Sequence, residues 1–174
     1  MVTSQLSEGD LLILRTVEVP QANDLDKVFR VAILVSRGAA TPEEVATGLD
    51  VVEREGAYYL AAARAMRVVR VDHRTTPTGY MLGYLGEDYL AASGKKRAAI
   101  IIQGTLAAPH VVYVAERLGL STPLSTPTPR ELHDVGLVER ELATLGELSG
   151  TTPRRRAGTL VAWMKAVDKL ARQA

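Results

Sequence analysis

The feature that most constrains this chain is a strongly specified helix start at Thr41-Pro42-Glu43-Glu44. Threonine suits the N-cap, proline suits the first helical position, and a glutamate three residues after the cap completes a capping box. We therefore expect a short helix that ends near Gly48, followed by a turn over residues 49–52. Because this start is so well defined, the elements on either side can be placed relative to it.

A helix is also predicted before this start, over residues 25–36. Asp24 can act as its N-cap, and Arg37-Gly38 is a suitable end. The apolar residues of this segment recur at helical spacing on one face; they are Val28, Val31, Ala32 and Val35. The apolar run over residues 11–19, closed by Pro20, is expected to form a strand or a buried extended arm.

A third helix is expected over residues 53–67, and a hairpin follows it. The apolar stripe of this helix is predicted to consist of Val52, Tyr59, Ala62, Ala63 and Met66. Residues 68–71 and 80–83 read as two short strands, and the polar segment between them contains proline and glycine turn residues. Helix, turn, helix and hairpin in this order predict a winged helix-turn-helix, an arrangement that can place a helix in the major groove of DNA.

The second half of the chain is predicted to be helical as well. Helices are expected over residues 95–105, 110–118, 130–134 and 137–146, with a Ser/Thr/Pro-rich loop over 120–129. A final helix follows the Thr152 cap and has Pro153 at its first position. The buried stripe of that helix is predicted as Leu160, Trp163, Met164, Val167 and Leu170.

A weak internal repeat relates the final helix to the third one. Arg54, Tyr58, Tyr59 and Ala63 have the same mutual spacing as Arg155, Thr159, Leu160 and Met164. The sequence therefore predicts a mainly α-helical fold with a small β-hairpin, built as two tandem winged-helix-like units. We place the N-terminal unit at residues 1–93 and the C-terminal unit at residues 94–174.

Composition excludes several classes of protein. The chain is 47% hydrophobic, which supports a folded core, but it has no apolar run of the length of a membrane-spanning helix. It contains no cysteine, and its N-terminus lacks the basic-then-apolar order of a signal peptide. A cytoplasmic protein is the resulting expectation.

The net charge of +1 conceals alternating blocks of charge. The formal charge is −5 over residues 1–60, +4 over 61–109, −3 over 110–150 and +5 over 151–174. The two basic blocks coincide with the predicted hairpin and the final helix, where a surface for phosphate contacts is expected. The alternative is that each block is an ordinary solvated helix face.

In the first unit, Arg54 stands where a recognition helix meets base edges. Its planar fork suits the O6 and N7 atoms of guanine or a phosphate. Tyr58 follows one turn later, and Arg64 also lies away from the apolar stripe. The alternative for Arg54 is an ion pair with Asp50 that only stabilises the helix start.

The hairpin adds three further predicted DNA contacts, which are Arg70, His73 and Arg74. A cationic hairpin beside a recognition helix commonly contacts phosphates or enters the minor groove. The alternative is an exposed hairpin without a partner.

In the second unit, Arg154, Arg155 and Arg156 open the final helix. Cations at a helix N-terminus oppose the macrodipole, so stability alone would favour Asp or Glu there. A polyanionic partner is the simplest explanation for these arginines, and a solvated face is the alternative. Thr152 at the cap and Lys165 on the outward face complete the predicted DNA contacts.

The sequence offers no pattern for catalysis or metal binding. Its three histidines are far apart, and no nucleophile triad or glycine-rich phosphate loop is present. Glu53 and Glu55 are a permissive variant of a nuclease carboxylate pattern, but they fall on a predicted helix. We therefore expect no catalytic residue, no metal and no cofactor.

The stretch over residues 28–92, with Arg54-Glu55-x-x-Tyr58-Tyr59 and the hairpin, resembles the winged-helix module attached to type II restriction endonucleases and other phage-defence proteins. The segment from Thr152 to Trp163 is similar to the final helix of that module. The resemblance covers about residues 20–170 and implies DNA reading through Arg54, Tyr58, Arg154 and Arg155. It also implies a nuclease or another defence protein as partner, although no nuclease sequence is present in this chain.

Three functions follow from these patterns. The first is a sequence-selective double-stranded DNA-binding protein or module that supplies target recognition in restriction, defence or transcription regulation. The second is a winged-helix protein-interaction module that binds an acidic partner. The third is a small nuclease whose sequence matches no nuclease pattern named above. Salt-dependent duplex binding separates the first from the second, and a cleavage assay addresses the third.

Overall fold

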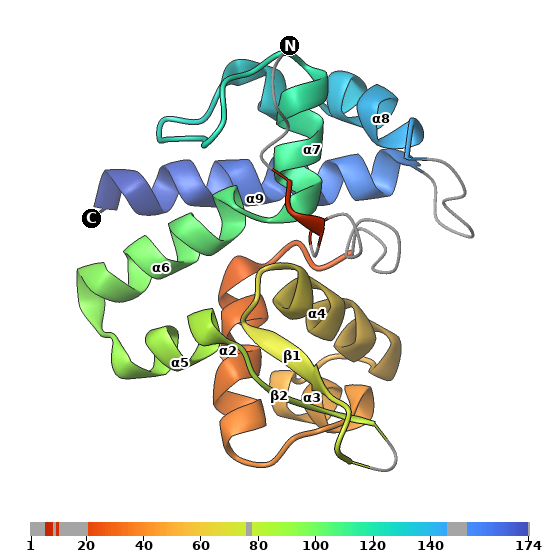
Figure 1. Ribbon diagram of the computed structural model, residues 1–174, viewed down its shortest axis with the longest axis vertical. Helices are drawn as coiled ribbons and strands as arrows, with labels where there is room; N and C mark the ends of the chain where they lie inside the picture. Colours follow the sequence, from red (N-terminus) through yellow and green to blue (C-terminus); the bar gives the residue numbers. More distant parts are fainter. Residues whose placement is uncertain (1–5, 9, 11–20, 76–77, 146–152, 174) are drawn as a thin grey trace.

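The computed structural model describes residues 6–8, 10, 21–75, 78–145 and 153–173 (Figure 1). Within these residues the fold is mainly α-helical, with eight α-helices and one two-stranded antiparallel sheet. The prediction of a mainly α-helical chain with a small hairpin is therefore confirmed. The apolar run over residues 11–19 lies outside the described residues, so the expectation of a strand or arm there stays a prediction.

Helices α2 and α3 begin where their capping residues predict, and α4 begins at its expected first residue without a side-chain cap. Helix α2 covers Leu25–Ser36, and the Asp24 carboxylate accepts hydrogen bonds from the backbone N–H groups of its first turn. Helix α3 covers Pro42–Leu49, and both hydrogen bonds of the predicted capping box between Thr41 and Glu44 are present. Helix α4 covers Glu53–Ala65 and ends two residues earlier than expected.

Helices α3 and α4 are in close contact through Gly56. A Cβ atom at this position would lie 2.2 Å from the backbone oxygen of Pro42 and 2.7 Å from the Cβ of Ala46. Only glycine lets the two backbones approach this closely. Gly56 therefore determines how α4 sits on α3, and with it where the outer face of α4 points.

The predicted apolar stripe of α4 is confirmed except at its first member. Tyr59, Ala62, Ala63 and Met66 are buried, whereas the side chain of Val52 is 67% exposed. Val52 occupies the N-cap of α4, where the chain is extended and has not yet joined the helical face. Leu60, which is 1% exposed, belongs to the core instead.

The hairpin follows α4 and packs beside α2 and α4 (Figure 1). Strand β1 covers Val69–Asp72 and strand β2 covers Gly79–Leu82, paired from Val69 with Leu82 to Asp72 with Gly79. Both strands lie within one residue of their predicted positions. The order α2, α3, α4, β1, β2 is the one that the sequence predicts.

The chain then continues as helices: α5 (Tyr84–Ala91), α6 (Gly94–Leu106), α7 (Pro109–Arg117), the short 3₁₀ helix η1 (Arg130–His133), α8 (Val135–Ala143) and α9 (Pro153–Gln173). Helix α5 was not predicted. Its start is glycine-rich, and these glycines are there for packing, since a Cβ at Gly86 would lie 2.1 Å from the Val68 oxygen. The described part of residues 94–174 contains no strand, so it shows no hairpin like that of the first half.

Residues from both halves share one hydrophobic core. Helix α9 packs against α6 and α8, and the buried indole N–H of Trp163 donates a 2.7 Å hydrogen bond to the backbone oxygen of Ala22, just before α2. The hydroxyl of Thr159 donates to Asn23 at 2.7 Å. The boundary between residues 93 and 94 falls between α5 and α6 and remains a prediction.

No single helix in the described ranges is long and apolar enough to span a membrane. Helices α6 and α7 together have the required length and composition, but they meet at a 55° bend. Both helices contribute buried side chains to the shared core, among them Ile101 and Val111.

Candidate nucleic-acid interface

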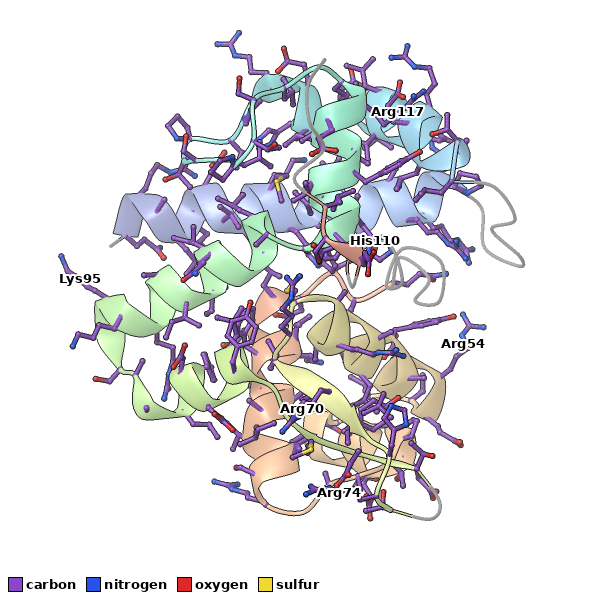
Figure 2. The ribbon with its side chains drawn as sticks, viewed as in Figure 1. Arg54, Arg70, Arg74, Lys95, His110 and Arg117 are labelled. Atoms are coloured by element: carbon purple, nitrogen blue, oxygen red, sulfur yellow. The ribbon has the colours of Figure 1, made fainter. Side chains whose placement is uncertain are left out.

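The outer face of α4 carries Arg54 and Arg64, and Tyr58 lies at its edge, half-buried against the core. Arg54 is exposed in the first turn, and its guanidinium lies 5.6 Å from the centroid of the half-buried Tyr58 ring, within cation–π range. Figure 2 shows Arg54 projecting from the beginning of α4. Among the described residues Arg54 forms no ion pair, so the alternative pairing with Asp50 is absent.

Two carboxylates accompany Arg54 in the first turn of α4. Tyr59 is buried beneath the helix, and burial, followed by the negative charges of Asp24 and Glu55, raises the pKa of its phenol. The charges of Asp24 and Glu55 thus act on the phenol of Tyr59, whereas Arg54 stands over the ring of Tyr58. Glu53 and Glu55 are both exposed in the first turn of α4, so Arg54 is flanked in sequence by two carboxylates.

A hollow of about 360 Å³ lies between the end of α4, the hairpin and the start of α5. Arg64, Arg67, Arg70 and His73 line it together with Tyr84. Its remaining lining residues are apolar or glycine: Val69, Val71 and Gly83. No described residue that lines this hollow is acidic, and Arg64 places the hollow beside the outer face of α4.

Arg67 is a member of this cationic hollow that the sequence did not indicate. It follows α4 with φ of 58°, in the left-handed region where glycine is the usual residue. Holding a non-glycine residue there costs roughly 1–2 kcal/mol. The Arg67 guanidinium forms an ion pair with Asp10, which anchors one side of it.

The three predicted DNA contacts on the hairpin differ in their surroundings, and Figure 2 labels two of them, Arg70 and Arg74. Arg70 and His73 are exposed and line the hollow, and Arg70 Nε donates to the backbone oxygen of Leu82 at 3.3 Å. Arg74 instead forms a two-point ion pair with Asp72, at 2.9 and 3.2 Å. Hydrogen bonds from Arg74 hold the pKa of the Asp72 carboxyl below its usual value. The charge of Arg74 is therefore partly compensated.

The cations of α9 lie in the other half of the molecule, beside α8 (Figure 1). Arg154 is 76% exposed and lies 3.8 Å from Glu139, a loose surface pair, and Arg155 and Lys165 are exposed. Arg156 was predicted to contact DNA, but it is completely buried, so we withdraw that expectation. Thr152 lies outside the described residues.

The burial of Arg156 follows from its place on the helix. Arg156 precedes Leu160 by four residues and Trp163 by seven, so it continues the buried stripe of α9 one turn toward the N-terminus. Leu160, Trp163, Met164 and Val167 are buried as predicted, and Leu170 is partly buried against the same core. The same helical periodicity, continued one turn toward the N-terminus of α9, predicts from the sequence that Arg156 is buried while Arg154 and Arg155 are exposed.

A cluster of Thr128, His133 and Asp168 joins the Ser/Thr/Pro-rich loop to α9. The Thr128 hydroxyl donates to Asp168 Oδ2 at 2.9 Å and lies 2.7 Å from His133 Nε2, which is itself 3.2 Å from Asp168 Oδ2. Both contacts of the imidazole use the same nitrogen. A nucleophilic site requires the base to contact the nucleophile through one nitrogen and the orienting carboxylate through the other. This cluster therefore serves to fasten the loop.

Within the described ranges, no three His, Cys, Asp or Glu side chains gather in a way that could hold a metal ion. Comparisons with models of known protein families, with curated proteins and with solved structures find no match. The chemistry of the surface itself therefore carries the functional argument.

Proposed function

We propose that this protein binds double-stranded DNA through a winged helix-turn-helix formed by α2, α3, α4 and the β1–β2 hairpin. In this proposal α4 is the recognition helix and the hairpin is the wing. The observation that carries the proposal is a surface with Arg54 exposed at the start of α4 and with Arg64, Arg67 and Arg70 at the hollow by its other end. A second set of contacts is proposed at the start of α9.

The spacing along α4 suits a DNA groove. Arg54 and Arg64 are ten residues apart, which corresponds to about 15 Å along a helix axis, and the major groove is about 12 Å wide. The residues between them on this face are small or planar; they are Ala57, Tyr58 and Ala61. A small outer surface lets the helix enter the groove while cations near its two ends reach bases and phosphates.

The two ends of this surface are proposed to act differently. Arg54, at the end that enters the groove, contacts a base edge, where a two-point arginine–guanine pair discriminates by about 1–3 kcal/mol. Arg64, Arg67 and Arg70 lie next to the wing and contact phosphates, which position the protein without reading sequence. In this proposal the protein supplies target recognition, either for a defence enzyme or as a free-standing regulator.

The protein is first used to enrich bound duplexes from a randomised pool. Fluorescence anisotropy then measures its affinity for labelled random and enriched duplexes over a range of salt concentrations. Each phosphate contact contributes about 0.9 to the slope of log affinity against log salt. Arg64→Ala should lower this slope by about that amount on every duplex. Arg54→Ala should instead reduce the preference for the enriched sequence.

Lys95→Ala provides the matched control. Lys95 is exposed at the beginning of α6, and Figure 2 shows it on the opposite side of the view from Arg54. Its removal lowers the net charge by the same amount as Arg64→Ala and should leave the salt slope unchanged. Absence of duplex binding at low salt refutes the proposed function. An equal effect of Lys95→Ala and Arg64→Ala refutes this location for the interface.

The start of α9 is tested separately with the double variant Arg154→Ala/Arg155→Ala. If these exposed arginines anchor phosphates, their loss weakens binding to all duplexes alike, because phosphate contacts carry no sequence information. Unchanged affinity in the double variant removes α9 from the interface and leaves the α4 surface as the whole of it.

A further inference from the structure

The hollow beside α4 contains one side chain that phosphate binding does not explain, which is Tyr84. In the described part of the chain, Tyr84 and Val52 are the large hydrophobic side chains that remain exposed, and Tyr84 is 56% exposed. It lines the hollow together with Arg64, Arg67, Arg70 and His73. A surface that only attracts phosphate needs the cations, and it gains nothing from an aromatic ring in water.

The fold holds Tyr84 in this position through a close backbone contact. A Cβ at Gly83 would lie 2.2 Å from the backbone oxygen of Arg67, so glycine is required to bring the start of α5 against the end of α4. The amide of Gly83 also donates to the backbone oxygen of Val68 at 2.9 Å. The next residue, Tyr84, is consequently set beside Arg67 at the hollow.

The combination of an exposed aromatic ring, cations and apolar walls has the chemistry that binds a nucleotide. Bases of single-stranded nucleic acids stack on aromatic side chains while the backbone is followed by positive charge. The half-buried Val71 adds an apolar wall that suits the face of a base or sugar. A volume of about 360 Å³ is at the small end of the range for ligand sites, about 300–1,000 Å³, and suits one nucleotide unit.

We propose that this hollow binds a single unpaired nucleotide, with its base stacked on Tyr84 and its phosphate held by Arg64 and Arg70. The inference rests on the proposed DNA-binding function, to which it adds recognition of a base outside the duplex. The same chemistry would accept a free nucleoside monophosphate, so the experiment has one arm for each source.

The first arm compares two labelled duplexes that differ by one extra, unpaired thymidine in the middle of one strand. We expect the wild-type protein to bind the bulged duplex about tenfold more tightly, the order of one base–aromatic stack. Tyr84→Ala should abolish this preference and leave affinity for the fully paired duplex unchanged. Tyr84→Phe should retain the preference, because the ring alone supplies the stacking. Since Tyr84 is exposed, equal melting temperatures are expected for all three proteins.

The second arm measures binding of AMP by calorimetry to the wild type and to Tyr84→Ala. AMP binding that depends on Tyr84, with equal affinity for the two duplexes, supports the nucleotide site and identifies a free nucleotide as its occupant. A bulge preference that persists in Tyr84→Ala refutes the proposal. So does the absence of both a bulge preference and AMP binding while the paired duplex still binds. Loss of binding to every duplex would refute the DNA-binding function instead.

Discussion

Gly56 offers a sharp test of the packing that orients the α4 surface. In an exposed helix, replacing glycine with alanine stabilises the fold by about 1 kcal/mol, because alanine loses less backbone entropy on folding. Gly56 is in the middle of α4, so helix propensity alone predicts that Gly56→Ala stabilises the protein. The structure predicts the opposite, because the new Cβ would lie 2.2 Å from the backbone oxygen of Pro42.

The magnitude follows from that contact. A carbon normally approaches a carbonyl oxygen no closer than about 3.3 Å, so α3 and α4 must separate locally by about 1 Å. Overpacking of a well-filled core costs about 1–3 kcal/mol, and the upper end applies here because the obstructing atoms are backbone and cannot rotate away. After the gain of about 1 kcal/mol from helix propensity, Gly56→Ala should lower the free energy of unfolding by about 2 kcal/mol.

Gly158→Ala is the matched control. Gly158 lies within α9, and a Cβ at this position would meet nothing within 4 Å. This substitution should therefore show the propensity gain alone, about 1 kcal/mol. In a protein of this size, about 1 kcal/mol shifts the melting temperature by roughly 2–4 °C. The two variants should thus move the melting temperature in opposite directions.

Urea denaturation followed by tryptophan fluorescence provides the measurement. Trp163 is the only tryptophan and is completely buried, so its emission reports on the shared core. Equal or greater stability of Gly56→Ala relative to the wild type would refute the α3–α4 contact described here. If both alanine variants destabilise the protein, the space around the added Cβ atom does not decide the effect of either substitution.

Two further predictions concern single side chains. Hydrogen bonds from Arg140 and, to a smaller extent, Arg117 hold the pKa of the Glu141 carboxyl below its usual value. Because the pKa is lower in the folded state, the ionised Glu141 stabilises the fold above the unfolded pKa of about 4.3. This stabilisation is lost as the pH falls through the folded pKa. Urea midpoints measured from pH 7 to acid should therefore fall more steeply in the wild type than in Glu141→Gln, and parallel curves would contradict this. Arg67→Gly removes the backbone strain of a non-glycine residue with positive φ and also removes the ion pair with Asp10, so the melting temperature should change little. The salt slope of duplex binding should decrease, and an unchanged slope would exclude Arg67 from the interface.

The helix starts were predictable because their determinants are local. The Asp24 cap and the Thr41–Glu44 capping box are hydrogen bonds between residues at most three positions apart. The hairpin was predictable for a similar reason, since turn residues separate two short apolar runs. The exposed position of Arg54 on α4 also followed from helical periodicity.

Other features depend on contacts between residues far apart in the chain. Helix α5 was missed because its glycines resemble a turn in sequence, whereas in the fold they let its backbone touch the oxygens of Arg67 and Val68. The charge of Arg156 indicates a surface position, whereas its place on the buried stripe of α9 puts it in the core. The cationic hollow could not be foreseen, since it combines the end of α4, the hairpin and the start of α5.

The sequence by itself therefore determined the helical class, the principal caps and the order of helix, turn, helix and hairpin, because hydrogen bonds to nearby backbone groups and side-chain periodicity act over a few residues. Only the tertiary structure decided which cations are accessible and which residues meet. Close backbone approaches at Gly56 and Gly83 set the positions of the helices, and those positions bring Tyr84 and Arg67 to the same hollow.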